Sequence, residues 1–504
     1  MPQWLFDSSP GLQLYDSRPP GRTGSNAEST SSGRLLKPMK SILITGLFTA
    51  VVSFLSPAQG ASPQRPPNLI VIMTDDQGYA DVGFNGCKDI PTPHIDSIAN
   101  NGVRFTEGYV SYSVCSPSRA GFLTGRYQQR FGHERNPLWK PNSRETGLPL
   151  SETTLADTLG KAGYQSGIIG KWHLGCHPDL HPLKRGFNEF FGHLGGGHRY
   201  FPEELTLQNT NEARNEGDSY KLWILRDQTP VKTTKYLTDE FSDEAARFIE
   251  RHKAGPFFLY LAYNAPHSPL QASEKSLARF PNIKNEKRRT YAAMVSAVDD
   301  GVGQVLTKLR ELGLEENTLV VFLSDNGGPG DNASDNRPLR GGKSTPWEGG
   351  IRVPFAVQWP GKIPKGLVYQ NPVISLDIFA TIAAQAKAVP NPDRPLDGVN
   401  LLPYLTGETP GAPHEALYLR MFDKGAYVVR NQEFKLVIEK KDATPELYNL
   451  KQDIGEKTNI AATTSEKLGA LENLRARWDS QLVPPVFEGL KSNSKAKAAK
   501  SPED

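Results

Sequence analysis

Polar side chains that can bind ions or move protons follow several short apolar runs of this sequence. They are Asp75, Asp76, Lys171, His173, His267, Asp325 and Asn326. Each apolar run reads as a buried strand, and in open α/β sheets ligands bind beyond the carboxyl ends of the strands. Solvated surface charges would not be distributed in this way. The pattern therefore predicts that these side chains meet at one edge of a parallel sheet.

The acidic and amide side chains of this group predict a metal site. Asp75 and Asp76 follow one apolar run, and Asp325 and Asn326 follow another. They offer only oxygen ligands, a set that suits Ca²⁺, or less well Mg²⁺, rather than Zn²⁺. A pair of aspartates more often caps a helix or lies in a loop. The second pair, at an equivalent strand end, favours the metal.

Histidines are the candidates for proton transfer, because their pKa lies near neutrality. His173 and His267 follow strand ends, although either one alone could be a buried structural histidine. His133 suits a substrate loop or a structural role equally well. His193 and His198 flank a run of glycines and are weaker candidates for substrate contacts.

A cysteine motif supplies a possible nucleophile. The stretch Cys115-Ser116-Pro117-Ser118-Arg119 continues through Ala120, Gly121, Thr124, Gly125 and Arg126, and it resembles the sulfatase signature. The alternative is a chance cysteine beside an ordinary helix start with Pro117 in the first turn. In the sulfatase family a dedicated formylglycine-generating enzyme oxidises this cysteine to formylglycine. One hydroxyl of the hydrated aldehyde attacks sulfur, and the second expels sulfate from the covalent sulfate-enzyme intermediate.

The resemblance continues along most of the chain, from about residue 67 to residue 461. The similar blocks are 163–164, 170–175, 264–267, 324–328, 342–343 and 347–354. Residues 181–184, with Gly186 and Phe187, are most similar to the branch that contains N-acetylgalactosamine-6-sulfatases and arylsulfatase A. The family resemblance implies an alkaline-phosphatase-like fold.

The resemblance also implies roles for the site residues. Formylglycine at Cys115 would add an oxygen ligand to the metal set. Arg119, Lys171 and Lys343 would surround the sulfate group, with Arg119 also holding the formylglycine. His173 would accept the proton in the step that expels sulfate. His267 would protonate the leaving alcohol, with Lys343 as the alternative acid.

Composition agrees with a large globular enzyme. The chain has 504 residues, a hydrophobic fraction of 37% and a charged fraction of 22%, so roughly two domains are expected. The formal charge of +3 and the lack of a basic groove with interleaved aromatics exclude nucleic acid as the expected partner. Three cysteines cannot form a disulfide scaffold; Cys87 and Cys176 could pair or remain free.

The N-terminal region predicts export. Residues 1–38 are expected to be a non-structural extension, with Met39 as the true initiator. Residues 39–60 read as a signal peptide with an apolar run at 42–55 and small residues before a cleavage site. A membrane anchor is the alternative, but the run is short against the ~20 residues of a spanning helix. The prediction is a periplasmic or extracellular protein without a stable membrane span.

The alternation of apolar runs and amphipathic stretches predicts an α/β fold with a mostly parallel sheet sandwiched by helices. Strands are expected at 69–73, 165–169, 257–263 and 319–323, with an extended piece at 103–110. Helices are expected at 94–101, 117–125 and 153–162. The strongest helix spans 291–312, where apolar residues recur at three- and four-residue spacings before Gly313.

The pattern changes after residue 389. Residues 66–389 are predicted to be the catalytic domain, and the prolines at 390–395 mark a linker. Residues 396–485 are predicted to form a smaller α+β subdomain, with antiparallel strands at 416–420, 426–430 and 435–438 and a helix at 465–482. Residues 488–504 read as a disordered tail.

Together these features predict an exported, Ca²⁺-dependent sulfuric ester hydrolase of the arylsulfatase type. The expected substrate is a sulfated carbohydrate or an aryl sulfate. The alternatives are a phosphoester or phosphonate hydrolase of the same superfamily fold, and a catalytically silent glycan-binding relative. The low number of histidines at the strand ends disfavours the two-zinc chemistry of the first alternative. Intact Cys115 and Arg119 disfavour the second.

Overall fold

The computed structural model describes residues 65–490, and its main element is a ten-stranded mixed sheet. In sheet order the strands are β11 (Leu367–Tyr369), β2 (Val103–Phe105), β10 (Phe355–Gln358), β9 (Thr318–Ser324), β1 (Asn68–Thr74), β8 (Phe257–Ala262), β4 (Gln165–Lys171), β5 (Glu189–His193), β6 (Ile224–Arg226) and β7 (Thr229–Val231). The central strands from β9 to β5 are parallel. β10, β6 and β7 pair antiparallel with their neighbours.

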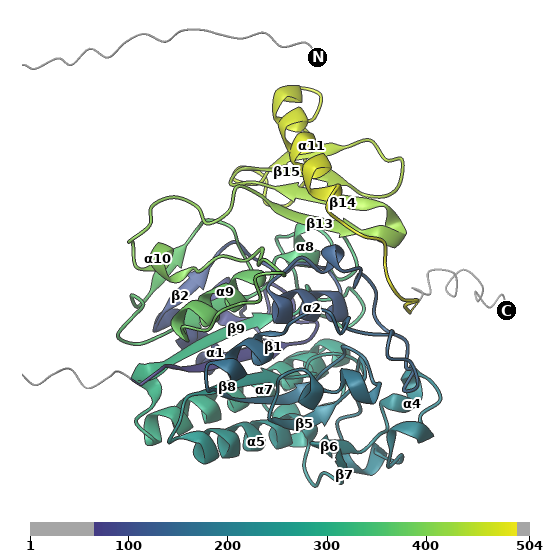
Figure 1. The fold of residues 1–504 in the computed structure, drawn as a ribbon, viewed down its shortest axis with the longest axis vertical. Coiled ribbons are helices and arrows are strands. Elements are labelled where there is room, and N and C mark those ends of the chain that lie inside the picture. The colour runs from purple at the N-terminus through teal and green to yellow at the C-terminus, as the bar shows by residue number, and fades with distance from the viewer. Residues whose placement is uncertain (1–64, 491–504) are drawn as a thin grey trace, which may run out of the picture. The chain divides into compact units, whose positions relative to one another are not determined.

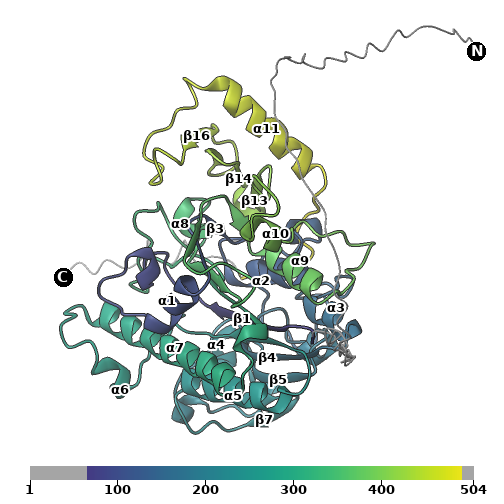
Figure 2. The ribbon, with the colours of Figure 1, turned by 90° about the vertical axis from the view of Figure 1, so that its left-hand side faces the viewer.

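Helices cover both faces of this sheet, as Figures 1 and 2 show. α1 (Pro93–Asn100), α5 (Leu237–His252) and α7 (Glu286–Glu311) pack against one face. α2 (Cys115–Thr124), α3 (Leu155–Lys161) and α9 (Leu376–Gln385) pack against the other. The central strands are therefore buried on both faces, which explains why they read as continuous apolar runs in the sequence.

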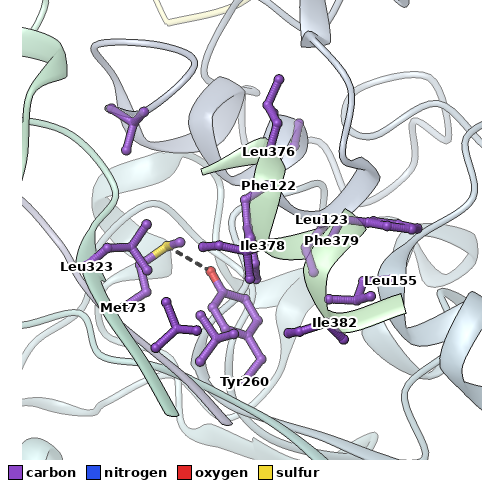
Figure 3. Packing of buried hydrophobic residues seen from close by; sticks show 14 of the residues in the cluster. Met73, Phe122, Leu123, Leu155, Tyr260, Leu323, Leu376, Ile378, Phe379 and Ile382 are labelled. Atoms are coloured by element: carbon purple, nitrogen blue, oxygen red, sulfur yellow. Dashed lines mark hydrogen bonds between the residues drawn. The ribbon is translucent and has the colours of Figure 1, made fainter. Parts of the chain in front are cut away.

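The face under α2 and α9 is packed with large apolar side chains (Figure 3). Met73 and Tyr260 project from β1 and β8 toward Phe122 of α2 and Ile378 of α9. The rings of Phe122 and Tyr260 lie 5.1 Å apart. Helix α2 carries Cys115 in its first turn, so this packing positions the predicted nucleophile against the sheet.

A second sheet follows the large one in the sequence. Its strands, β13 (Leu417–Met421), β14 (Ala426–Arg430), β15 (Phe434–Ile438) and β16 (Glu446–Asn449), are all antiparallel. Helix α11 (Ser465–Asp479) covers one face through Leu471. The remaining elements are β3 (Gly108–Tyr109), β12 (Val373–Ile374), α4 (Glu216–Ser219), α6 (Glu274–Leu277), α8 (Glu348–Ile351) and α10 (Leu402–Leu405).

The predicted fold class is confirmed. All of the expected strands and helices form, with ends that shift by a few residues. Lys171 is the last residue of β4, whereas the predicted strand ended two residues earlier, at residue 169. The segments that form α5, α9, β5 and β10 were not identified from the sequence. The segment that forms β16 was not identified as a strand either.

The domain boundaries near residues 389–396 stay predictions, since the described residues share one compact unit. The predicted extension at 1–38 and the signal peptide at 39–60 lie outside the described residues. Of the predicted tail, residues 488–490 are described, and the Leu490 amide donates to Asn136 O. Cys87, Cys115 and Cys176 are free thiols. Between residues 65 and 490, no helix has the length and apolar character to cross a membrane.

A fully buried ionic network joins the second sheet to the segment that carries α8. Lys435 Nζ on β15 lies 2.9 Å from Glu348 Oε1 and 2.8 Å from Glu456 Oε1. The Glu348 amide also donates to Glu456 Oε2. Burial alone would raise the pKa of Glu348, but the charges of Lys435 and Arg352 lower it to about 2. The two carboxylates therefore depend on Lys435 for their charge balance.

Replacing Lys435 with Met should destabilise the fold strongly. The change leaves Glu348 and Glu456 buried without their shared cation, and breaking such a buried pair costs about 3–5 kcal/mol. Equilibrium unfolding in urea should show this loss. Lys467→Met, at an exposed position of α11, is the matched control and should change stability little. Equal stabilities for the two variants would contradict the proposed dependence.

Candidate active site

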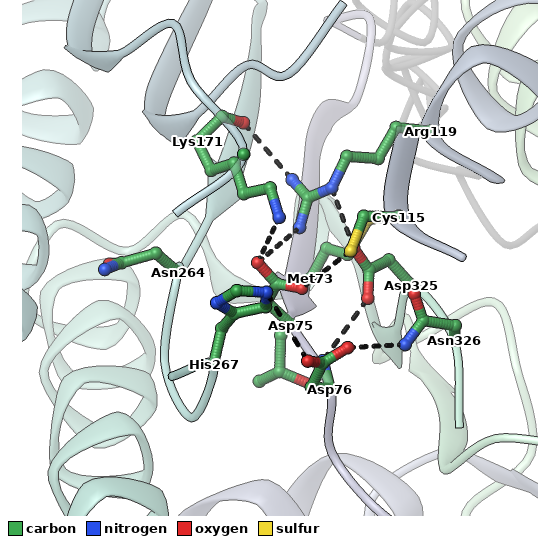
Figure 4. A network of polar contacts seen from close by, with 12 residues as sticks. Met73, Asp75, Asp76, Cys115, Arg119, Lys171, Asn264, His267, Asp325 and Asn326 are labelled. Carbon is green, nitrogen blue, oxygen red and sulfur yellow. Dashed lines mark hydrogen bonds and ion pairs between the residues drawn. The ribbon is translucent and has the colours of Figure 1, made fainter. Parts of the chain in front are cut away.

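The carboxyl ends of the central strands meet at one edge of the large sheet. In register, Thr74 of β1 pairs with Ser324 of β9, and Met73 pairs with Ala262 of β8. The segments that follow these strand ends carry the predicted site residues. Figure 4 shows Asp75, Asp76, Cys115, Arg119, Lys171, His267, Asp325 and Asn326 converging on one small volume. The structure thus brings together the group that the sequence predicted, including Lys343 from a later loop.

Cys115 is the first residue of α2 and is almost fully buried. Its Sγ lies 3.4 Å from Asp75 Oδ1 and 3.2 Å from Lys343 Nζ. Burial and the charge of Asp75 raise the pKa of the Cys115 thiol to about 12. The unmodified side chain is therefore a protonated thiol at neutral pH and a poor nucleophile.

Arg119 lies one helical turn after Cys115 and is fully buried. Its Nε donates to Asp325 Oδ2 at 2.8 Å, and Nη1 donates to Lys171 O at 3.2 Å. Nη2 has no hydrogen-bond partner and lies 3.8 Å from Asp75 Oδ2. Arg119 therefore links α2 to the ends of three strands and keeps one N–H group available for a ligand.

The carboxylates are neutralised by nearby cations. Lys171 forms an ion pair with Asp75, and Lys343 Nζ lies 2.6 Å from Asp76 Oδ1. Burial alone would raise the pKa of Asp76, but Lys343 and His267 lower it to about 2. Burial and the charge of Asp75 raise the pKa of Asp325 to about 6, against the opposing charge of Arg119. Several carboxyl groups thus share one small buried volume.

The donor set of this cluster fits a divalent metal ion. Ligand atoms of Asp75, Asp76, Cys115 and His267 lie within 4.8 Å of one another. Asp325 lies beside this group, because its Oδ1 accepts a hydrogen bond from the Asp76 amide at 3.4 Å. Asn326 Nδ2 donates to Asp76 Oδ1, while Asn326 Oδ1 is buried without a partner. A buried oxygen without a donor is a ready ligand for a cation.

The geometry differs from the sequence prediction at one ligand position. His267, predicted only as an acid, belongs to the group whose ligand atoms are closest together. Its Nε2 lies 3.5 Å from Asp76 Oδ2, and Nδ1 lies 2.6 Å from Ser268 O. Burial lowers the pKa of His267 to about 3, although Asp76 opposes this effect. The side chain is therefore neutral in this structure.

Unusual backbone conformations occur beside several site residues. Asp76, His173 and Ser344 adopt φ values of 64°, 58° and 66°, a region that non-glycine residues rarely occupy. Strained residues of this kind cluster at functional sites, where the surrounding structure holds them. Gly170 has φ 111°, and a Cβ there would lie 1.9 Å from Ala262 O. Only glycine therefore fits directly before Lys171.

The other predicted histidines occupy different environments. His173 is 3% exposed, and neither ring nitrogen has a hydrogen-bond partner among residues 65–490. His133 Nε2 lies 2.7 Å from Ser116 Oγ, which places it behind the first turn of α2. Both ring nitrogens of His198 contact backbone oxygens, so neither is available to a ligand. His193 packs against His198 at 4.8 Å and has no polar partner.

Glu216 and Tyr220, at the two ends of the short α4 segment, belong to no motif that the sequence reveals. Glu216 Oε1 and His173 Nε2 both lie beside Gly196. Glu216 and Tyr220 both pack against the glycine run 195–197. The glycine run is the sequence feature that could have pointed to these two residues, because consecutive glycines permit close approach of other groups.

Comparisons with known proteins agree with this geometry. The family model described as "Sulfatase" matches residues 67–388. A second model, "N-sulphoglucosamine sulphohydrolase, C-terminal", matches residues 342–480. N-acetylgalactosamine-6-sulfatase from Homo sapiens is 38% identical over 370 residues, which cover 69% of this chain and 67% of that protein. The chain belongs to the sulfatase family. It is a sulfuric ester hydrolase.

Other relatives support the same assignment. Steryl-sulfatase from Mus musculus is 33% identical over 456 residues, covering 76% of this sulfatase and 72% of that protein. The crystal structure titled as Ps i-CgsB in complex with k-i-k-neocarrahexaose is 39% identical, with a TM-score of 0.79 and coverage of 84% of this chain and 94% of that chain. The family implies a metal ion and formylglycine, and the Asp, Cys and His cluster of this sulfatase can hold a metal.

A divalent cation should stabilise this sulfatase through the carboxylate cluster. A ligand present at 100 times its Kd stabilises the folded state by about 2.7 kcal/mol. Adding a divalent cation to chelator-treated protein should therefore raise the thermal unfolding midpoint. Asp325→Ala should lose most of this shift. Asp331→Ala, at an exposed position, should keep it, and a full shift in Asp325→Ala would contradict the assignment of Asp325 to the metal site.

Proposed function

We propose that this sulfatase hydrolyses a sulfate ester on a glycan, using formylglycine at position 115 and a bound Ca²⁺ ion. The observation that carries the proposal is the convergence of Cys115 with Arg119, Lys171 and Lys343 at the carboxylate cluster. A sulfate group is an anion that gains negative charge in the transition state. Fixed cations around residue 115 stabilise that charge without reorganisation.

Formylglycine at position 115 would supply, as a hydrated aldehyde, one hydroxyl for attack on sulfur and a second that later expels sulfate. Arg119 orients residue 115, because its guanidinium is held by Asp325 Oδ2 and by Lys171 O. Lys343 Nζ lies 3.2 Å from the Sγ atom of residue 115. Lys343 can therefore contact both the nucleophile and a sulfate oxygen.

The proposed metal ligands are Asp75, Asp76, Asp325, Asn326 and the oxygen of formylglycine 115. A bound Ca²⁺ would supply positive charge that stabilises the negative charge developing on the sulfate group. The oxygen-rich donor set supports Ca²⁺, with Mg²⁺ less suited. The imidazole of His267 in the same cluster is the feature that would favour Zn²⁺. A larger thermal shift with Ca²⁺ than with Zn²⁺ supports the proposal, and the reverse order contradicts it.

Two histidines are proposed to move protons. His173 has two unpartnered ring nitrogens and accepts a proton from residue 115 in the step that expels sulfate. His267 protonates the leaving alcohol through Nε2, since Nδ1 lies against Ser268 O. The neutral state of His267 means that it must take up a proton first. Lys343 is the alternative acid, because Asp76 raises its pKa against the effect of burial and keeps it protonated, and its Nζ lies 3.2 Å from the Sγ atom of residue 115.

A glycan substrate is supported by the relatives. A 39% identical structure is titled as a complex with k-i-k-neocarrahexaose, and several relatives are N-acetylgalactosamine-6-sulfatases. An aryl sulfate is expected to be accepted as well. The second candidate is phosphoester or phosphonate hydrolysis. Its support is the fold shared with phosphonate monoester hydrolase SpPMH from Silicibacter pomeroyi, at 20% identity and a TM-score of 0.62.

Export and maturation belong to the same proposal. A signal peptide at residues 39–60 would direct the chain to the periplasm or the cell exterior, and a formylglycine-generating enzyme would act on Cys115. Residues 66–389 would form the catalytic domain and residues 396–485 the C-terminal subdomain. Sulfate release from a panel of sulfated oligosaccharides and nitrophenyl sulfate, beside phosphate release from matched esters, tests the function. If protein that carries formylglycine at position 115 releases no sulfate, the result would instead support the catalytically silent glycan-binding alternative.

Active protein should carry formylglycine at position 115. Mass spectrometry of the peptide spanning residues 105–126 should show loss of the thiol and gain of an aldehyde. Cys115→Ala should abolish turnover while leaving the fold largely intact, because alanine fits the same helix start. Full activity in a preparation with only unmodified Cys115 would overturn the proposed nucleophile.

The acid can be identified by varying the leaving group. A nitrophenolate leaves without a proton, whereas a sugar alkoxide does not. His267→Ala should therefore reduce turnover of a sugar sulfate by about 10²–10⁴-fold more than turnover of nitrophenyl sulfate. His173→Ala should slow both substrates. Equal losses on both substrates in His267→Ala would instead assign His267 to sulfate or metal binding and favour Lys343 as the acid.

A further inference from the structure

The glycine run at residues 195–197 brings a short acidic segment up to the catalytic edge. A Cβ added at Gly195 would lie 2.7 Å from Ser219 Oγ, and one added at Gly197 would lie 2.5 Å from Tyr220 Cζ. Neither clash can be relieved easily, because α4 and Tyr220 pack directly on the glycine backbone. The glycines therefore allow this segment to approach more closely than any other residue type would.

The middle glycine separates Glu216 from His173. A Cβ at Gly196 would lie 2.8 Å from Glu216 Oε1 and 2.7 Å from His173 Nε2. No hydrogen bond or ion pair joins Glu216 and His173 within residues 65–490. The carboxylate and the imidazole thus approach the same point beside Gly196.

Among the described residues, only one carboxylate oxygen of Glu216 has a hydrogen-bond partner. Its Oε1 accepts the Gly196 N–H at 2.6 Å, and Asn215 caps the α4 turn on which it lies. Glu216 Oε2 has no protein partner in the described part of the chain, and no lysine or arginine there forms an ion pair with this carboxylate. Burial raises the pKa of Glu216, whereas the Gly196 N–H and Lys171 lower it, so Lys171 is close enough to act on its charge.

Tyr220 presents a second free polar group beside Glu216. Its side chain is half-buried, and its hydroxyl has no hydrogen-bond partner among the described residues. Burial raises the pKa of Tyr220, and the charge of Glu216 adds to this effect. The hydroxyl therefore lies beside Gly197, within the electrostatic reach of Glu216.

We propose that Glu216 and Tyr220 bind the sugar hydroxyl groups next to the sulfated carbon, and that Glu216 excludes a second anionic group there. This inference rests on the proposed glycan sulfatase function. A neutral hydroxyl can donate to Glu216 Oε2 and can also contact Tyr220 or His173. A sulfate or carboxylate substituent in the same place would face an unpaired carboxylate, and such a repulsive contact is a common source of specificity.

Substitution of Glu216 should affect sugar substrates selectively. A hydrogen bond to a charged group contributes enough for a loss of about 10- to 100-fold when it is removed. In Glu216→Gln and Tyr220→Phe, kcat/KM for the fastest sulfated oligosaccharide of the panel should fall about 10- to 100-fold more than kcat/KM for nitrophenyl sulfate. The loss should lie mainly in KM, because the hydroxyl is bound in both the ground state and the transition state.

Glu203→Gln is the matched control. Glu203 is an exposed glutamate of the connection between β5 and β6, outside α4, and its substitution should leave both substrates unaffected. Equal effects of Glu216→Gln on the sugar and the aryl substrate, with wild-type sugar activity present, overturn this inference alone. Wild-type hydrolysis of nitrophenyl sulfate without hydrolysis of any sugar sulfate overturns both the glycan function and this inference.

A charge test examines the exclusion of a second anion. The wild type should prefer a monosulfated sugar over its disulfated counterpart with sulfate on the neighbouring carbon. Glu216→Gln removes the repulsive charge and should reduce this preference by about tenfold or more. An unchanged preference in Glu216→Gln overturns the proposed role of the charge.

Discussion

The packing of several buried charges into one volume is the constraint on which this structure depends. Asp75, Asp76 and Asp325 lie together at the carboxyl edge of the sheet, where desolvation makes an unpaired charge very costly. Arg119 and Lys171 balance them from α2 and from the end of β4. Because Arg119 also binds Lys171 O, the helix with residue 115 and the strands with the acidic groups hold one another in place. The same balance of charges suits a divalent cation and a sulfate group, which arrive with opposite signs.

The second sheet supports this site from a distance. The ammonium of Lys424, between β13 and β14, donates to Ser344 O, and the Ser344 amide donates to Ser113 O at 2.7 Å. These contacts hold the loop that presents Lys343 and the segment that leads into Cys115. The buried network of Lys435, Glu348 and Glu456 fixes the next part of the same loop. A C-terminal sheet without catalytic groups can therefore affect catalysis by holding the loops that carry them.

Close backbone approaches decide the shape of the substrate side of the site. Gly170 lets Lys171 enter the cluster beside Ala262 O, and Gly196 lets Glu216 face His173. In both places a single methyl group would collide with its neighbours. The charged residues that converge on residue 115 match the roles proposed for sulfate binding, whereas the α4 segment beside the glycine run 195–197 is the part proposed to contact the sugar. The proposals thus assign sulfate transfer to the cluster around residue 115 and selection of the sugar to the α4 segment.

The sequence by itself determined the strands β1, β4, β8 and β9, the long helix α7 and the set of polar residues at the strand ends. Apolar runs and three- to four-residue spacings are local signals, and parallel strands necessarily bring their carboxyl ends together. The tertiary structure alone decided which of these residues touch. It placed His267 within the metal cluster, used both nitrogens of His198 in backbone contacts, and brought Glu216 to His173. Such contacts join segments far apart in the chain, and they depend on how loops without periodicity pack, which no local pattern records.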